Sequence, residues 1–109
     1  MVRKGRRMRH AFLIIAHDNP EILYAQLEAL DSENNDFYYH LDKRMNINKM
    51  DLERYAKKSK IYYVNPQKIY WGHYSQVECE LRLLETALNN RTKYDYYHLL
   101  SGVDMPLKS

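Results

Sequence analysis

Residues 11–16 read Ala-Phe-Leu-Ile-Ile-Ala and form an apolar run without polar alternation. Such a run is typical of a strand that is buried on both faces of a parallel sheet. The polar residues 17–19 follow at once, and Pro20 then suits the first turn of a helix. Isoleucine and leucine recur at helical spacing over residues 22–30. The sequence therefore predicts a strand, a polar turn and a helix that ends near Asp31.

The same alternation continues along the chain. Strands are predicted over 37–41, 61–64 and 94–100, where tyrosine and aliphatic residues lie between turn residues. Each of these strands contains a tyrosine pair, which should place one ring on each face of the sheet. A short helix starting at Asn48 or Asp51 is expected between the second and third strands. The element order predicts an α/β fold with four mostly parallel strands and helices on both faces.

The helix predicted over 74–90 has the strongest periodicity in the chain. Ser75 is its expected N-cap, and Glu78 completes a capping box three residues later. Its main apolar stripe is formed by Val77, Leu81, Leu84 and Leu88, with Cys79, Leu83 and Ala87 beside it.

Composition excludes several classes of protein. The 109 residues are 45% hydrophobic and 13% aromatic, which argues against intrinsic disorder, and 3 Gly and 3 Pro exclude a collagen-like chain. A single cysteine, Cys79, excludes a disulfide scaffold and a zinc ribbon. The sequence therefore indicates one globular domain, or part of one.

The positive charge is concentrated at the start of the chain. The formal charge is +3, yet five of the 17 basic residues lie within residues 1–9, which leaves 12 basic against 14 acidic residues, a net of −2, in the rest. We expect residues 1–8 to form a basic, disordered leader and residues 9–109 to form the domain. The body is not a basic nucleic-acid module, although the leader could contact a nucleic acid or a membrane surface. No signal peptide or membrane span is predicted, so the expected location is cytoplasmic or peripheral on a membrane.

The polar residues that follow the strands are the candidates for a binding site. In open α/β sheets, ligands bind outside the carboxyl ends of the strands. Asp42 could accept hydrogen bonds from a ribose or a base, or it could be an exposed turn residue that pairs with Lys43 or Arg44. Trp71 could stack on a nucleobase or a sugar, or it could plug the rim of the core, and Gly72 permits close backbone approach. The full candidate set is His17, Asp42, Lys43, Trp71, Gly72, Ser101, Gly102 and Asp104.

Several catalytic motifs are missing. The chain has no GxGxxG or P-loop sequence, no GxSxG elbow and no clustered histidines with metal-ligand spacing. His40 and His98 are interpreted as hydrogen-bonded histidines within strands. Asp104 follows Gly102 where an Asp-x-Asp motif would need a second carboxylate, so no divalent metal is expected.

Four segments together carry a resemblance to a known family. They are residues 11–20, the His-Leu-Asp-Lys sequence at 40–43, the Trp-Gly-His-Tyr-Ser sequence at 71–75 with Glu78, and residues 96–108, which end in Ser-Gly-Val-Asp-Met-Pro-Leu-Lys. These segments resemble the core-2/I-branching enzyme family of glycosyltransferases. The family comprises β-1,6-N-acetylglucosaminyltransferases, with peptide xylosyltransferases as relatives.

The resemblance implies a GT-A fold whose Rossmann-like first half binds a nucleotide sugar. It implies inverting transfer from a UDP-sugar, such as UDP-N-acetylglucosamine, to a glycan acceptor without a metal cofactor. By position, His17 and Asp42 match the family's uridine contacts, Trp71 matches an aromatic residue near the uracil, and residues 101–104 line the site.

The resemblance also limits what the 109 residues are expected to do. In the family, the general base and the basic residues at the diphosphate lie beyond the segment that matches residues 101–108. We therefore expect the N-terminal, donor-binding part of a transferase, inactive by itself. The alternative is a non-catalytic α/β module that binds a partner or forms an oligomer through its open sheet edge. Nucleic-acid binding through the basic leader ranks last.

Overall fold

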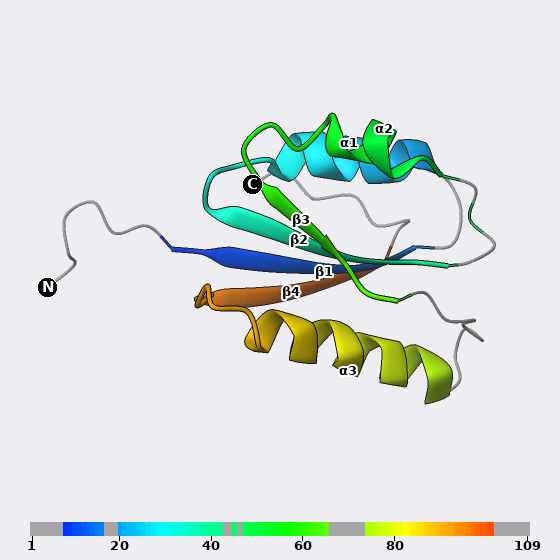
Figure 1. The fold of residues 1–109 in the computed structure, drawn as a ribbon, viewed down its shortest axis with the longest axis vertical. Coiled ribbons are helices and arrows are strands. Elements are labelled where there is room, and N and C mark those ends of the chain that lie inside the picture. Colours follow the sequence, from blue (N-terminus) through cyan, green and yellow to red (C-terminus); the bar gives the residue numbers. More distant parts are fainter. Residues whose placement is uncertain (1–7, 17–19, 43–44, 46, 66–73, 102–109) are drawn as a thin grey trace, which may run out of the picture.

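The computed structural model describes residues 8–16, 20–42, 45, 47–65 and 74–101 of the chain. Strands and helices alternate in the order β1 (His10–Ala16), α1 (Pro20–Leu30), β2 (Asn35–Leu41), α2 (Lys49–Glu53), β3 (Lys60–Tyr63), α3 (Tyr74–Leu88) and β4 (Tyr96–Ser101). The strands form one sheet in the order β3-β2-β1-β4, and every neighbouring pair is parallel. Helices α1 and α2 cover one face and α3 covers the other (Figure 1). The predicted α/β fold is confirmed.

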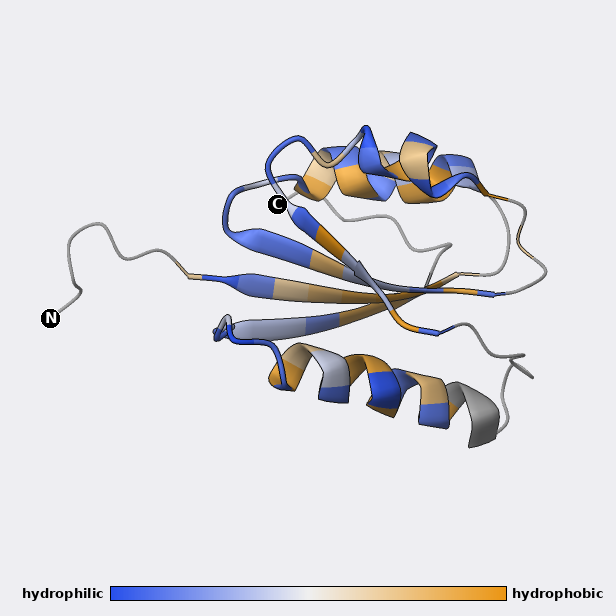
Figure 2. Ribbon diagram, viewed as in Figure 1, coloured by the Kyte–Doolittle hydropathy of each residue, from blue (hydrophilic) through white to orange (hydrophobic). Residues whose placement is uncertain are grey.

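The two sides of the sheet bury two separate apolar clusters, because side chains alternate along each strand. On β1, Ala11, Leu13 and Ile15 face α3, whereas Phe12, Ile14 and Ala16 face α1 and α2. The hydropathy colouring shows this apolar strip running between the two helical layers (Figure 2). The apolar run of residues 11–16 is therefore buried on both faces of the sheet, as its lack of polar alternation predicts.

The tyrosine pairs divide between the two faces as predicted. Tyr38 lies in the cluster under α3 and stacks on Tyr62, with ring centroids 4.8 Å apart. Tyr39 lies in the opposite cluster and stacks on Tyr63. Burial raises the pKa of Tyr39 far above its ordinary value, so this phenol stays neutral.

Several predicted element boundaries differ by one or two residues from the observed ones, and two of the differences concern a particular side chain. Helix α3 begins at Tyr74, so Ser75 lies inside its first turn and is not the N-cap. The last strand begins at Tyr96 and not at residue 94, because the Tyr94 side chain turns into the core, where its hydroxyl hydrogen-bonds Asp36. At α2, by contrast, Asn48 is the N-cap, and its side chain accepts a 2.8 Å hydrogen bond from the Met50 amide.

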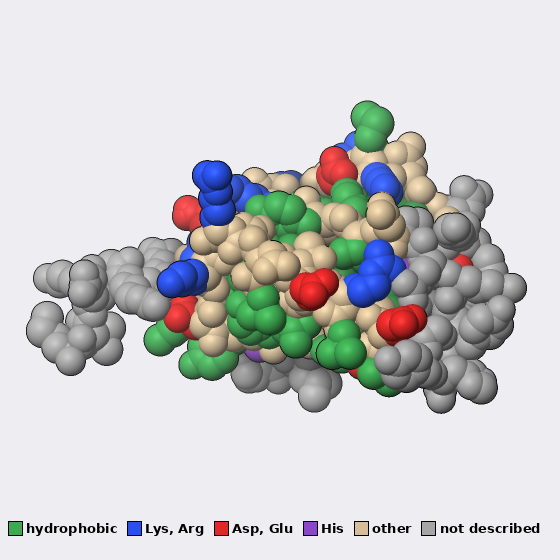
Figure 3. All heavy atoms as spheres, turned by 60° about the horizontal axis from the view of Figure 1, so that its bottom comes forward, with side chains coloured by type: hydrophobic (Ala, Val, Ile, Leu, Met, Phe, Trp, Pro, Cys, Tyr) green, Lys and Arg blue, Asp and Glu red, His purple; other side chains and the backbone are tan. Residues whose placement is uncertain are grey.

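Helix α3 buries the apolar residues that lie beside its main stripe, and not the main stripe itself. Cys79, Leu83 and Ala87 are fully buried against β1 and β2. In the main stripe, Val77, Leu81 and Leu88 are exposed, whereas Leu84 is partly buried against the same cluster. Tyr97 and Leu99 of β4 are also exposed. Apolar side chains gather on this side of the molecule (Figure 3). The chain therefore exposes an apolar surface between α3 and β4.

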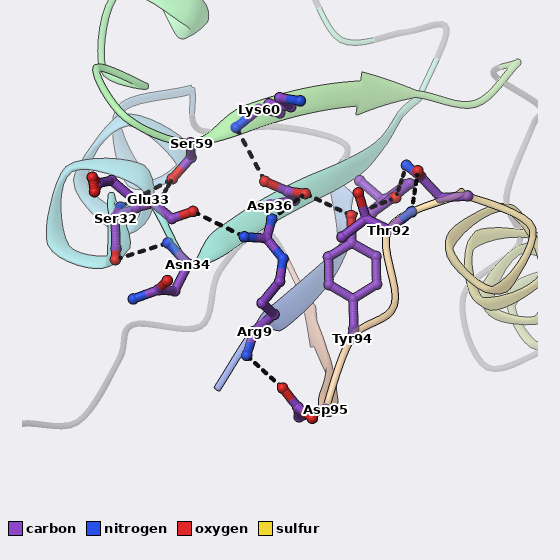
Figure 4. Close-up of polar contacts among 12 residues, drawn as sticks. Arg9, Ser32, Glu33, Asn34, Asp36, Ser59, Lys60, Thr92, Tyr94 and Asp95 are labelled. Carbon is purple, nitrogen blue, oxygen red and sulfur yellow. Dashed lines mark hydrogen bonds and ion pairs between the residues drawn. The ribbon is translucent and has the colours of Figure 1, made fainter. Parts of the chain in front are cut away.

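A polar network closes the amino-terminal edge of the sheet (Figure 4). The Asp36 carboxylate is 1% exposed and accepts hydrogen bonds from the Tyr94 hydroxyl at 2.6 Å and from an Arg9 guanidinium nitrogen at 3.2 Å. The Lys60 amide donates to its other oxygen at 3.3 Å. The Tyr38 hydroxyl lies 2.8 Å from that of Tyr94. One carboxylate thus joins β2, β3, the residue before β1 and the segment before β4.

Asp31 holds the turn before β3 in place. Its carboxylate accepts hydrogen bonds from the backbone amides of Lys57, Lys58 and Ser59, at distances of 2.9–3.2 Å. Partial burial by itself would raise the pKa of Asp31, but these hydrogen bonds outweigh it and lower the pKa below its ordinary value. The carboxylate therefore links the end of α1 to the start of β3.

We expect Asp31→Ala to lower the free energy of unfolding by about 1–2 kcal/mol at neutral pH, because three backbone amides lose their acceptor. The native pKa is lowered, so this stability is present above the unfolded-state pKa and is lost as pH falls through the native pKa. Urea unfolding of both proteins from neutral pH down to about pH 2 measures the effect. A stability difference that does not shrink with acidification would contradict this role.

Candidate functional site

The carboxyl ends of three strands meet at one edge of the sheet. Ala16 is in register with Leu41, and Ile15 is in register with Ser101. The Asp42 amide donates a 2.9 Å hydrogen bond to the Ala16 carbonyl, so Asp42 directly adjoins the end of β1. The structure thus brings the segment after β2 next to the ends of β1 and β4. This is the edge at which open α/β sheets bind ligands.

Asp42 is the best-described side chain of this edge. It is only 2% exposed, and its carbonyl accepts a 2.9 Å hydrogen bond from the Met45 amide, which turns the chain at the strand end. Side chains alternate along β2 and the residue that follows it, so Asp42 shares the α3 side of the sheet with Tyr38 and His40. A largely buried carboxylate needs compensating polar or cationic partners.

A basic side chain of α3 reaches the same region. Arg82 donates a 3.1 Å hydrogen bond to the carbonyl of Asn65, just beyond β3. Burial, and then the positive charge of Arg82, lower the pKa of His40, which lies on this side of the sheet. The spacing of α3 does not reveal this role, because an arginine on a surface helix is ordinarily solvated. Only the packing of α3 on β1 and β2 brings Arg82 to the carboxyl edge.

His40 and Cys79 support the site without being reactive themselves. Burial is the main cause that lowers the pKa of His40, so its imidazole is neutral at neutral pH. Burial also raises the pKa of the Cys79 thiol to about 12, which keeps it protonated and non-nucleophilic. His40 lies buried within β2, as its interpretation as a strand histidine requires, and its hydrogen bonding stays a prediction.

The other strand histidine lies at the opposite end of the sheet. His98 Nε2 is 2.9 Å from His10 Nδ1, a hydrogen-bonded pair that joins β4 to β1. Burial and then the neighbouring His10 lower the pKa of His98. Within the described ranges, no three His, Cys, Asp or Glu side chains are grouped so that they could hold a metal ion.

Most of the predicted site residues are not among those described. Asp42 is described in full, and Ser101 is described as the last residue of β4 without its side chain. The rest lie outside the described residues: His17, Lys43, Trp71, Gly72, Gly102 and Asp104. Their roles stay predictions. None of the helices in the described part is long and apolar enough to cross a membrane.

The comparison with known families decides the identity of this fold. The model of the core-2/I-branching enzyme family matches residues 10–109, from the first residue of β1 onward. The chain belongs to the core-2/I-branching enzyme family. A search of curated proteins found no match.

The core-2/I-branching family is a family of glycosyltransferases, so the chain belongs to that class of protein. The substrates of the family's reaction are a sugar donor and an acceptor. The resemblance stated from the strand-end sequences is thereby confirmed. The parallel sheet and its clustered strand ends are consistent with part of a Rossmann-like domain. Within this family fold, the edge that carries Asp42 is the candidate donor site.

Proposed function

We propose that this chain forms the donor-binding part of an inverting, metal-independent glycosyltransferase that uses a UDP-sugar, with N-acetylglucosamine as the sugar. The observation that carries the proposal is the buried Asp42 carboxylate at the carboxyl edge, directly beside the end of β1. A carboxylate in this position accepts hydrogen bonds from the hydroxyl groups of a ribose or the N–H of a uracil. The chain's family supplies the reaction class.

The surroundings of Asp42 suit a fixed acceptor of hydrogen bonds. His40, whose pKa burial lowers, adds no positive charge on this side of the sheet, and Arg82 brings a cation to the same edge through its hydrogen bond to the Asn65 carbonyl. Charge-assisted hydrogen bonds are about twice as strong as neutral ones, so a carboxylate held in this way contributes both affinity and orientation. The proposed partners of Asp42 in binding the nucleotide are His17, Trp71 and residues 101–104.

Transfer itself needs groups beyond donor binding. In an inverting reaction, a general base deprotonates the acceptor hydroxyl as it attacks the anomeric carbon, and cationic groups stabilise the departing diphosphate. We propose that residues 1–109 bind UDP without transferring sugar. The resemblance supports this, because it places the family's base beyond the segment that matches residues 101–108.

Calorimetric titration with UDP tests the donor site. We expect Asp42→Asn to weaken UDP binding about 10- to 100-fold, because a charged hydrogen bond contributes about 1.5–3 kcal/mol. Asp51→Asn, on the exposed part of α2, should bind UDP as the unaltered chain does. Binding should also be unchanged when a chelator removes divalent metals.

Two results would overturn the proposal. One is a folded chain that does not bind UDP, and the other is equal affinity in Asp42→Asn and the unaltered chain. Circular dichroism of each variant separates lost binding from lost structure. If the 109 residues released UDP in the presence of an acceptor, the proposal that they bind the donor without transferring its sugar would be refuted.

A further inference from the structure

Two histidines on neighbouring strands share one hydrogen bond near the amino-terminal end of the sheet. His10 Nδ1 lies 2.9 Å from His98 Nε2, and the centroids of the two rings are 5.1 Å apart. The centroid separation is close to the N–N distance plus one ring radius at each end. The rings therefore meet edge to edge, with the two nitrogens facing each other, as a hydrogen bond requires.

Aromatic rings enclose this histidine pair. The Phe12 ring stacks on His98 with centroids 4.6 Å apart, and the Tyr96 ring stacks on His10 at 5.1 Å. Both histidines are partly buried. Neither neighbouring ring carries a carboxylate that could balance a positive charge on an imidazole.

The charged groups of the surrounding elements are Arg9 before β1, Asp95 before β4, Arg91 and Lys93 on the link from α3, Asp36 of β2, and Glu21, Glu28, Asp31 and Glu33 in and after α1. Asp95 accepts a hydrogen bond from the backbone amide of Arg9, and the Arg9 side chain binds Asp36 on the α3 side of the sheet. Glu28 and Asp31 line a cavity with α2, and Glu21 lies where α1 begins, at the carboxyl edge. Within the described part of the chain, the charged neighbour that acts on the pKa of His98 is His10, which lowers it.

A hydrogen bond between two imidazoles tolerates one added proton but not two. In the neutral pair, one ring donates its N–H to the bare nitrogen of the other, and one added proton still leaves a bare nitrogen as acceptor. A second proton puts an N–H on both facing nitrogens and brings two positive charges together. In the unfolded chain, each histidine gains its own proton near pH 6.5, so acid favours the unfolded chain.

We propose that the His10–His98 pair is an acid-sensitive contact that holds β4 on β1 at neutral pH and weakens as the pH falls below about 6.5. The native pKa of His98 is lowered, so the stability that the pair provides is present above the unfolded-state pKa and is lost as pH falls through the native pKa. The strand that the pair holds ends at the carboxyl edge, beside β1.

Urea unfolding of the full chain at pH 8 and pH 5 tests this proposal. The variant that combines His10→Phe and His98→Phe keeps the aromatic stack but removes both titrating groups. An excess of one proton on the unfolded chain changes the unfolding equilibrium constant tenfold per pH unit. We therefore expect this constant to rise at least about tenfold more in the unaltered chain than in the double variant between pH 8 and pH 5.

The two single variants complete a double-mutant cycle. The coupling between His10 and His98 should be favourable at pH 8 and smaller or absent at pH 5. Tyr96→Phe is the matched control, because it keeps both histidines and the ring beside His10, and its pH dependence should equal that of the unaltered chain.

A histidine NMR titration gives a readout that does not depend on unfolding. In the unaltered chain, the His98 imidazole should titrate at a lower pH than in His10→Phe, where the neighbouring charge is absent. Coupling that is equal at pH 8 and pH 5 would overturn the proposal. So would a His98 titration that His10→Phe leaves in place, or a double variant with the full pH dependence of the unaltered chain.

Discussion

Asp36→Ala is expected to lower the free energy of unfolding by about 3 kcal/mol, the low end of the range for removing one partner of a buried ion pair. The substitution leaves the Tyr94 hydroxyl and the Arg9 guanidinium without their acceptor at the amino-terminal edge of the sheet. The Arg9 side chain is 33% exposed, so water partly solvates its charge once the carboxylate is removed. This solvation places the expected loss of stability at the low end of the range.

The Asp36 network extends beyond the ion pair. Burial, and then the hydrogen bond to Asp36, raise the pKa of Tyr94, so its hydroxyl stays protonated and donates to the carboxylate. Tyr38 then donates to Tyr94 and accepts a 2.6 Å hydrogen bond from the Asn90 side chain. Removal of Asp36 therefore disturbs a chain of hydrogen bonds that reaches the segment after α3.

Urea unfolding measures the effect of Asp36→Ala, with Asp51→Ala as its control. Asp51 also pairs with an arginine, Arg54, but the two side chains are 45% and 77% exposed. An exposed pair contributes about 0–1 kcal/mol, so the control should be close to the unaltered chain. Asp36→Asn, which keeps the size and part of the hydrogen bonding, should lose less than Asp36→Ala. Similar losses in the Asp36 and Asp51 variants would contradict the network's role.

Leu83→Ala is expected to destabilise the chain by about 2–5 kcal/mol, the cost of a cavity in a packed core. Leu83 is fully buried between α3 and the sheet, in the cluster that contains Leu13 and Tyr38. Leu81 provides a matched control on the same helix, because it is the same residue type and is 56% exposed. Leu81→Ala should change stability by no more than about 0.5 kcal/mol.

Thermal and urea unfolding of the two variants check the orientation of α3. A larger loss in Leu81→Ala than in Leu83→Ala would mean that α3 is rotated relative to the described structure.

Much of the fold follows from local pattern. The apolar run 11–16, Pro20 at the helix start and Asn48 at the N-cap each predict an element that the structure contains. Strands that alternate with helices lead to parallel pairing, and parallel pairing brings the strand ends to one edge. The position of Asp42 beside the end of β1 could therefore be predicted from its place after a strand.

Contacts between distant residues could not be predicted in this way. Tyr94 and Asp36 are 58 positions apart, and nothing in either segment marks one as the partner of the other. Arg82 likewise reaches Asn65 only because α3 lies across β1 and β2. Such contacts depend on how helices and strands pack against one another. The spacing of residues along the sequence predicts only the helix or strand in which those residues lie.

The sequence by itself determined the order of strands and helices, the parallel sheet, the polar strand ends and, through their combined motifs, the family. Only the tertiary structure decided which side of α3 is buried. The stripe through Leu81 has the stronger apolar pattern, yet the stripe of Cys79, Leu83 and Ala87 faces the sheet. Small side chains such as Cys79 and Ala87 let the helix approach the strands closely, and close packing across the interface, more than hydrophobicity alone, selects the buried side.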